Sequence, residues 1–300
     1  MSRSDSFLSR GKRSGEGMRD PTKSPLIPVA VLVALIFPGL ATAQSIAAVR
    51  VAGSGSILDP AAAFWESAPV VTVATIPQTI TAPTKIDPAV KSLSIQAAHN
   101  GEWMAFRLQW EDPTKSDVLV VDRFGDQVAI ELPNRFKEDA LPSPMMGNPG
   151  ARVSVMQWRA AFQRDLDEGE ATVRDIYPYA LVDVYPDQVL SAIDARPYQG
   201  AIGVDNPVSQ ARKSPVLDQM AEGWGTMTVK MEQHADGRGR WADGRWQVVI
   251  THPLKSGSDN DPELVPGGKT VAAFAVWEGG AKEVGSRKAW TPWVPVTLAE

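Results

Sequence analysis

Two tight-turn signals, each between strand-like runs, constrain the fold of this 300-residue chain more than any other feature. Asn100-Gly101 separates residues 92–99 from residues 102–110, and in the second run every other side chain is a large apolar one. Asp243-Gly244 interrupts residues 240–251 in the same way. Because Asn-Gly and Asp-Gly favour two-residue hairpins, and a period of two gives each strand one apolar face, the sequence predicts paired antiparallel strands.

The rest of the chain continues this pattern, with few signs of helix. Further strands are predicted over residues 127–132, 153–158, 180–184, 225–230 and 270–277. Short helical pieces are predicted over residues 61–66 and 158–167, and residues 189–219 have the weak periodicity of a long loop. We therefore predict a mostly β protein, an antiparallel β-sandwich with long loops and a few short helices.

The first 43 residues have the layout of a secretory signal peptide. Basic residues are scattered over the first 24 positions, an apolar run follows over residues 25–40, and Ala41-Thr42-Ala43 supplies a small-x-small cleavage pattern. A membrane anchor is the alternative, but Pro38 and Gly39 interrupt the end of an already short run. We expect a Sec-type signal cleaved near Ala43, a periplasmic protein without a membrane anchor, and one domain over residues 44–300.

Charge and cysteine content exclude several classes of protein. Without residues 1–43 the chain loses six of its 30 basic and three of its 35 acidic residues, which leaves a formal charge of −8. An acidic chain lacks the basic footprint that nucleic acids require, so no nucleic-acid partner is expected. The chain has no cysteine, which excludes disulfides, thiolate zinc sites, iron–sulfur clusters and the covalent attachment of c-type haem.

Motifs for catalysis are absent from the sequence. There is no G-x-S-x-G nucleophile elbow, and no glycine-rich stretch has the spacing of a phosphate-binding loop. The histidines His99, His234 and His252 lie far apart, and the acidic stretch over residues 258–263 lacks EF-hand spacing and is typical of a polar turn. We therefore predict a protein that catalyses no reaction of its own.

Ten tryptophans are many for a chain of this length. Five of them fit strand patterns, where a large side chain fills the core of a sandwich: Trp103, Trp110, Trp158, Trp246 and Trp277. Trp224, Trp290 and Trp293 lie outside clean alternation. These three are the candidates for a sugar-binding surface or for the lining of a flat cofactor.

Several short stretches, in their order and spacing, resemble one known protein family. They are MMGNP (145–149), VSVMQWRA (153–160), GVDNP (203–207), RKSPV (212–216), AEGWGT (221–226), GRWQVVITHPL (244–254), VAAFAVWEG (271–279) and RKAW (287–290). In this order they are similar to the haem b (gamma) subunit of type II molybdoenzymes of the dimethyl sulfoxide reductase family. That group includes the third subunits of ethylbenzene dehydrogenase, dimethyl sulfide dehydrogenase, selenate reductase and chlorate reductase.

The resemblance implies a sandwich similar to carbohydrate-binding modules, adapted to hold one haem b between a methionine and a lysine. The methionine precedes a glycine in the first stretch, which makes it Met146, with Met145 as the second choice. The lysine lies before the Ser-Pro-Val segment, which makes it Lys213. Arg212 beside it is a candidate partner for a haem propionate. His99 and His252 stay open as alternative ligands.

The chemistry of such a ligand pair is consistent with the composition. Methionine sulfur is a soft, neutral ligand that favours ferrous iron and raises the reduction potential. Lysine can bind iron only as the neutral amine, and burial helps because desolvation disfavours the ammonium form.

The leading hypothesis is a non-catalytic electron-transfer subunit of a periplasmic molybdenum oxidoreductase. It would form a heterotrimer with a catalytic subunit that holds the molybdenum cofactor and with an iron–sulfur subunit. It would exchange electrons with a periplasmic cytochrome or another carrier. The alternative is a periplasmic carbohydrate-binding module that holds no haem and uses exposed tryptophans as stacking platforms.

Overall fold

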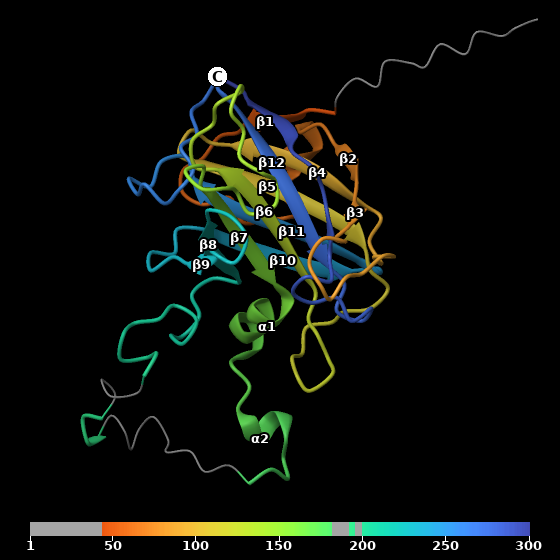
Figure 1. The fold of residues 1–300 in the computed structure, drawn as a ribbon, viewed down its shortest axis with the longest axis vertical. Coiled ribbons are helices and arrows are strands. Elements are labelled where there is room, and N and C mark those ends of the chain that lie inside the picture. Colours follow the sequence, from red (N-terminus) through yellow and green to blue (C-terminus); the bar gives the residue numbers. More distant parts are fainter. Residues whose placement is uncertain (1–43, 182–191, 196–199) are drawn as a thin grey trace, which may run out of the picture. The chain divides into compact units, whose positions relative to one another are not determined.

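The computed structural model describes residues 44–181, 192–195 and 200–300 (Figure 1). The predicted signal peptide lies outside these residues, as does most of the predicted strand over residues 180–184. Within the described part of the chain, no helix is long and apolar enough to cross a membrane.

Strands dominate the described chain. The strands are β1 (Ile46–Arg50), β2 (Val71–Ala74), β3 (Ile76–Pro77), β4 (Ser92–His99), β5 (Trp103–Glu111), β6 (Gln127–Pro133), β7 (Val153–Arg159), β8 (Val216–Ala221), β9 (Thr228–Val229), β10 (Asp236–Ala242), β11 (Arg245–Pro253), β12 (Lys269–Trp277), β13 (Ala289–Trp290) and β14 (Val294–Leu298). The helices are a 3-10 turn, η1 (Ala63–Ser67), and the α-helices α1 (Ala160–Glu168) and α2 (Val173–Ile176).

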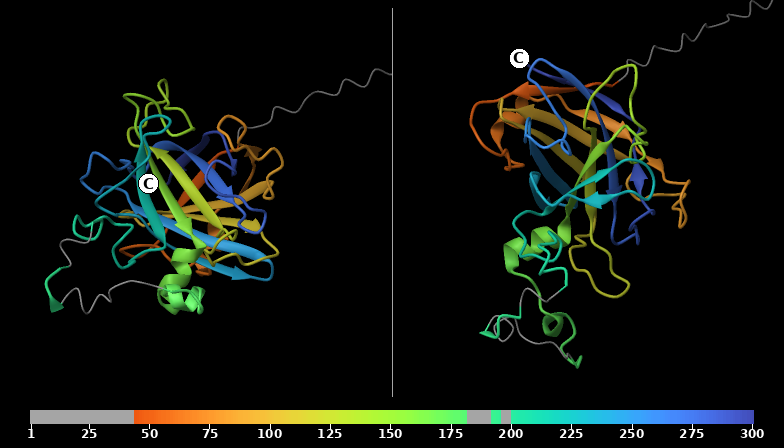
Figure 2. Two further views of the ribbon diagram at one scale, coloured as in Figure 1. Left: turned by 60° about the horizontal axis from the view of Figure 1, so that its bottom comes forward. Right: turned by 60° about the vertical axis from the view of Figure 1, so that its left-hand side comes forward.

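The strands form one curled sheet with the order β10-β11-β5-β4-β1-β14-β12-β6-β7-β8-β9. The long strand β12 connects the two layers of the fold, because its first half pairs with β14 and its second half pairs with β6. It therefore belongs to both layers of the sandwich, which close on each other as Figure 2 shows. Every pairing is antiparallel except those of β1, which lies parallel to β4 and β14. The predicted antiparallel β-sandwich is confirmed.

Aromatic side chains fill the space between the two layers. The ring of Trp158 on β7 meets the edge of Trp246 on β11 at a centroid distance of 4.9 Å, and Trp110 on β5 stacks on Trp246 at 6.3 Å. All three are buried, as the strand patterns predict. Phe106 and Phe274 make a second contact between the layers at 6.0 Å. This core anchors one face of β6, β7 and β12, so their other face is available for a site.

The structure differs from the sequence prediction on both sides of the long loop. Residues 216–219 were expected in the loop but form most of β8, which pairs with β7 along its length. The sequence does not indicate this strand because Asp218 and Gln219 are polar, but both side chains are buried in the structure. Ala180 and Leu181, expected to begin a strand, lie in irregular chain.

Candidate functional site

The outer face of β6, β7, β8 and β12 carries a cavity of about 630 Å³. Strand alternation explains its lining, since Val128 and Ile130 on β6 face the core whereas Ala129 and Glu131 face the cavity. Small side chains at Ala273 and Ala275 of β12 leave the floor open. Other strand residues of the lining include Val155 and Gln157 of β7, Gln219 of β8 and Trp277 of β12.

The loop that carries the predicted methionines lies at this cavity, and both Met145 and Met146 line it. Met146 has φ 70°, a left-handed conformation that costs a non-glycine residue roughly 1–2 kcal/mol. Its N–H donates to Glu131 Oε2 at 3.4 Å, and its carbonyl accepts from the N–H of Gly223 at 2.7 Å. Gly147 is also left-handed, and a Cβ there would approach the Ala151 carbonyl oxygen at 2.7 Å. Strained backbone held by its surroundings is common at functional sites.

A lysine lines the same cavity, but it is Lys288 and not the predicted Lys213. Lys288 lies just before β13, with Nζ 5.0 Å from the centre of the Trp277 ring. Among the described residues its ammonium has no hydrogen bond and no ion pair within 4.0 Å. Burial lowers the pKa of Lys288, although the nearby Glu131 carboxylate acts in the opposite direction. The burial of Lys288 thus shifts its pKa in the direction of the neutral amine that a metal ligand must be.

Glu131 is an acidic residue that lines the same cavity as Lys288. Burial raises the pKa of Glu131 to about 7, while the charge of Lys288 and the N–H of Met146 act against this rise. Its Oε1 is buried and accepts no hydrogen bond in the described part of the chain. An unpaired buried oxygen is costly, so this corner of the cavity is incompletely satisfied by the chain alone.

Lys213 and Arg212 lie away from the cavity. Lys213 is exposed, and neither residue is part of the lining. Arg212 stacks its guanidinium 3.5 Å from the centre of the Phe162 ring, and its Nε donates to Asp165 at 2.7 Å, so its polar atoms are engaged on α1. The assignment of Lys213 as a ligand stays a prediction that this arrangement does not favour.

The arginine that lies at the cavity is Arg159, and not the candidate propionate partner Arg212. Arg159 at the end of β7 lines the cavity and donates from Nη2 to Gln157 at 2.9 Å. Burial lowers the pKa of Arg159, helped by the nearby charge of Arg212, and its Nε is buried without a partner among the described residues. The cavity therefore has an apolar floor, with a cation available at one edge for an acidic group.

Of the three unpatterned tryptophans, two line the cavity. Trp290 on β13 and the half-exposed Trp224 both contribute to its wall, and Trp293 packs with Met146 against the apolar cluster around Trp277. This position is compatible with both roles that the sequence leaves open, a sugar-binding surface and the lining of a flat cofactor. The arrangement can hold a flat, mostly apolar group with thioether, amine and guanidinium side chains around it.

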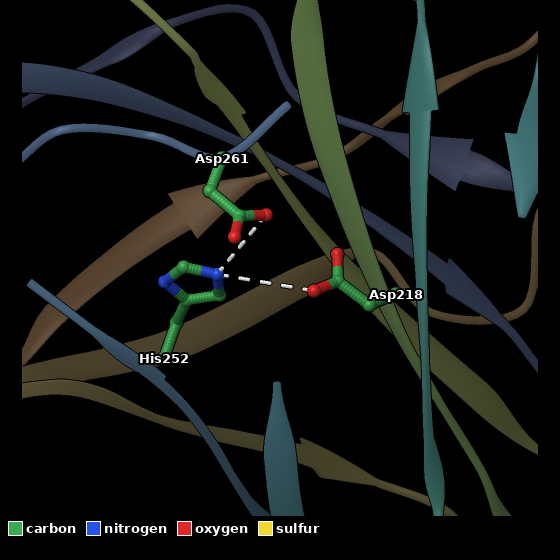
Figure 3. A group of neighbouring side chains, drawn as sticks. All are labelled: Asp218, His252 and Asp261. Atoms are coloured by element: carbon green, nitrogen blue, oxygen red, sulfur yellow. Dashed lines mark ion pairs between the residues drawn. The ribbon is translucent and has the colours of Figure 1, made fainter. Parts of the chain in front are cut away.

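A second polar cluster is buried elsewhere in the sandwich (Figure 3). The imidazole of His252 on β11 points at two carboxylates, with Nε2 at 3.5 Å from Asp261 and 3.8 Å from Asp218. Three acidic or imidazole ligands this close resemble a metal site. However, the buried ammonium of Lys230 lies 2.8 Å from Asp218 and 2.5 Å from Asp261. The cluster therefore contains its own cation, and we interpret it as a structural ion network.

This network should make stability depend on pH through Asp261. Burial alone would raise the pKa of Asp261, but hydrogen bonds from His252 and Lys230 outweigh it and hold the pKa well below its ordinary 3.8. A lowered folded-state pKa contributes stability that is complete above the unfolded value and is lost as the pH falls through the folded value. The Tm should therefore fall steeply below about pH 4, and Asp261→Asn should be less stable at neutral pH but flatter in acid. Parallel curves of Tm against pH for the two proteins would contradict this.

Fold and cavity together define a class, the β-sandwich with an apolar cavity on the outer face of one of its sheets. Residues 62–289 match the family model described as ethylbenzene dehydrogenase, and the chain belongs to this family. The family resemblance of the sequence motifs is thereby confirmed.

Two relatives match along most of their length. A "putative respiratory nitrate reductase heme subunit" of Haloferax mediterranei is 24% identical over 273 residues, which covers 89% of this chain and 79% of the relative. The chlorate reductase subunit gamma of Ideonella dechloratans is 27% identical over 255 residues, which covers 83% and 82%.

Solved structures offer only a remote likeness. A family 9 carbohydrate-binding module from Caldicellulosiruptor kristjanssonii, in complex with glucose, is 10% identical with a TM-score of 0.41, over 85% of this chain and 95% of the module. The same module in complex with cellotriose gives the same values of identity and TM-score. A similarity this low says nothing about a shared ligand.

Sequence reasoning missed Lys288, Glu131 and Arg159. Lys288 stands inside one of the family-like stretches, residues 287–290, but the sequence alone does not show that this lysine lines the same cavity as the methionine loop. Glu131 interrupts an otherwise apolar run on β6, and a charge in such a run is the signal that marks a polar function. Arg159 ends a wholly buried strand and carries the same signal.

Proposed function

We propose that this cavity binds one haem b and that the chain is a non-catalytic electron-transfer subunit of a molybdenum oxidoreductase complex. The observation that carries the proposal is the meeting of the strained Met146 loop and Lys288 in one apolar cavity. The names of the relatives support it, since one is called a heme subunit and the other a gamma subunit of chlorate reductase.

The residues present fit a haem. The volume of about 630 Å³ lies within the range of cofactor pockets, and most of the lining is apolar. Met146 and Lys288 would hold the iron, Met145 is the alternative to Met146, and Arg159 would pair with a propionate. A bound haem supplies reversible one-electron transfer, which none of the protein's own side chains offers.

The chain's own groups would prepare the site. Lys288 Nζ must lose a proton before it can bind iron, and its burial already favours that loss. Glu131, whose pKa is raised to about 7, is the group whose charge acts on Lys288 and is placed to take up a proton at Oε1. The apolar side chains of Ala129, Ala273 and Ala275 would keep the floor beneath a bound haem free of polar groups, which is one of the influences on its potential.

The other parts of the proposal concern location and partners. The leader over residues 1–43 supports export to the periplasm, and the absence of cysteine requires that any iron–sulfur centre belongs to another subunit. We propose a heterotrimer with a molybdenum-cofactor subunit and an iron–sulfur subunit, with a periplasmic cytochrome or similar carrier as external partner. The acidic chain suits docking to a basic carrier.

The test is the pyridine haemochrome spectrum of the purified protein, produced with haem supplied. One haem of b type per chain is expected, with a Soret band that shifts on reduction by dithionite. A well-folded protein that takes up no haem would overturn the proposal and favour the carbohydrate-binding module, with Trp224 and Trp290 as the stacking surface.

A further inference from the structure

Three buried carboxylates meet at a second place in the fold, where three strands end or begin. Asp112 follows the last residue of β5, Asp126 precedes the first residue of β6, and Glu278 follows the last residue of β12. The register brings the last two together, since Trp277 and Gln127 are direct partners across β12 and β6. One oxygen from each of the three carboxylates lies within 4.8 Å of the others.

This cluster contains no cation in the described part of the chain. Asp112 and Asp126 are fully buried and Glu278 is 7% exposed, yet no lysine, arginine or histidine of the described residues forms an ion pair with any of them. The contrast is with the Asp218 and Asp261 pair, where the Lys230 ammonium supplies the positive charge. Three close carboxylates without a counter-ion repel one another, which is costly when water is excluded.

The hydrogen bonds made by the cluster leave part of it unsatisfied. Asp126 accepts from the N–H groups of Ser116 at 2.7 Å and Gly279 at 2.8 Å and from Trp246 Nε1 at 2.9 Å. Asp112 Oδ1 accepts from the N–H of Thr114 at 3.0 Å, but Asp112 Oδ2 is buried and accepts no hydrogen bond among the described residues. A fully buried carboxylate oxygen without a donor is the feature that a bound cation would explain.

The donor set has the chemistry of a hard-cation site. Besides the carboxylates it contains the hydroxyl of Thr114, which lies 3.2 Å from Glu278 Oε1 and 3.3 Å from Asp112 Oδ1. Gly280 closes over the cluster, because a Cβ there would lie 2.8 Å from Glu278 Oε1 and 3.5 Å from the Ser116 hydroxyl. All of these ligand atoms are oxygens, and irregular cages of carboxylates and hydroxyls suit calcium better than magnesium, which demands near-ideal octahedral geometry.

We propose that Asp112, Asp126 and Glu278 bind one calcium ion. The ion neutralises the carboxylates, satisfies Asp112 Oδ2 and ties the end of β5 in one layer to the ends of β6 and β12 in the other. Asp126 also lines the large cavity, so the ion stabilises one edge of this cavity. The site does not depend on the identity of the cavity's ligand.

Terbium luminescence tests this directly, because Trp246 donates to Asp126 and its indole lies beside the site. Terbium added to the purified protein, previously stripped with chelator, should emit on tryptophan excitation, and calcium should displace it. Calcium should also raise the Tm of the stripped protein by about 5–10 °C. Asp112→Asn should lose at least 90% of the emission and of the Tm shift.

The matched control is Asp59→Asn, which removes a carboxylate that accepts, among the described residues, only the N–H of Ala61 at 2.8 Å. It should respond to both ions as the wild type does. Metal analysis of the untreated protein should find one calcium per chain that Asp112→Asn lacks. The proposal is overturned if the wild type shows neither emission nor a Tm shift, or if Asp112→Asn responds as strongly as the wild type.

Discussion

Replacing Met146 with alanine should weaken haem retention at least about tenfold and lower the reduction potential of what remains bound. The thioether is a neutral ligand that favours ferrous iron, so its loss stabilises the ferric state relative to the ferrous one. The measurement is a redox titration followed by absorption, together with the haem content per chain after gel filtration. The fold should survive, because Met146 packs only at the margin of the small cluster around Trp277.

Met145→Ala is the control for this prediction. Both methionines line the cavity, but only Met146 has the left-handed backbone that its neighbours hold in place. Met145→Ala should keep the haem spectrum and potential of the wild type. Loss of the low-spin spectrum in Met145→Ala with retention in Met146→Ala would move the ligand by one residue.

Removing the Lys230 ammonium should destabilise the protein by about 3–5 kcal/mol. Lys230 is 5% exposed and lies between Asp218 and Asp261, so Lys230→Met leaves two facing carboxylates without their cation. The free energy of unfolding from urea denaturation measures this effect. A loss below about 1 kcal/mol, the size of a surface ion pair, would show that the network does not depend on this charge.

Lys91→Met is the matched control. Lys91 pairs with Asp87, but both side chains are largely exposed, so the same substitution should change stability by less than about 0.5 kcal/mol. Adding Asp218→Asn to Lys230→Met should recover part of the lost stability, because the Asp261 carboxylate then no longer faces the carboxylate of Asp218.

The sequence predicts much of this fold because its signals are local. Asn100-Gly101 and Asp243-Gly244 set two hairpins by turn chemistry alone, and β4, β5 and β11 follow with small errors at their ends. The predicted helix over residues 158–167 is found at Ala160–Glu168. The strand β8 is missed because Asp218 is buried by long-range partners, Lys230 and His252, that no local window contains.

The site follows the same division between local and long-range information. The sequence singles out two methionines that line the cavity in the structure, since a motif before a left-handed glycine is local. The lysine depends on which loop folds back over the outer face of β12, and that is decided by the pairing of β13 with β12. Lys213 and Lys288 both stand in family-like stretches, and only the three-dimensional arrangement distinguishes them.

The most direct test of the account compares the absorption spectra of Lys288→Ala and Lys213→Ala, oxidised and reduced, with that of the haem-loaded wild type. If the haem lies in this cavity, Lys288→Ala loses the low-spin spectrum while the exposed Lys213→Ala is unchanged. A normal spectrum in Lys288→Ala with loss in Lys213→Ala would contradict the cavity assignment and require the long loop to carry the ligand instead.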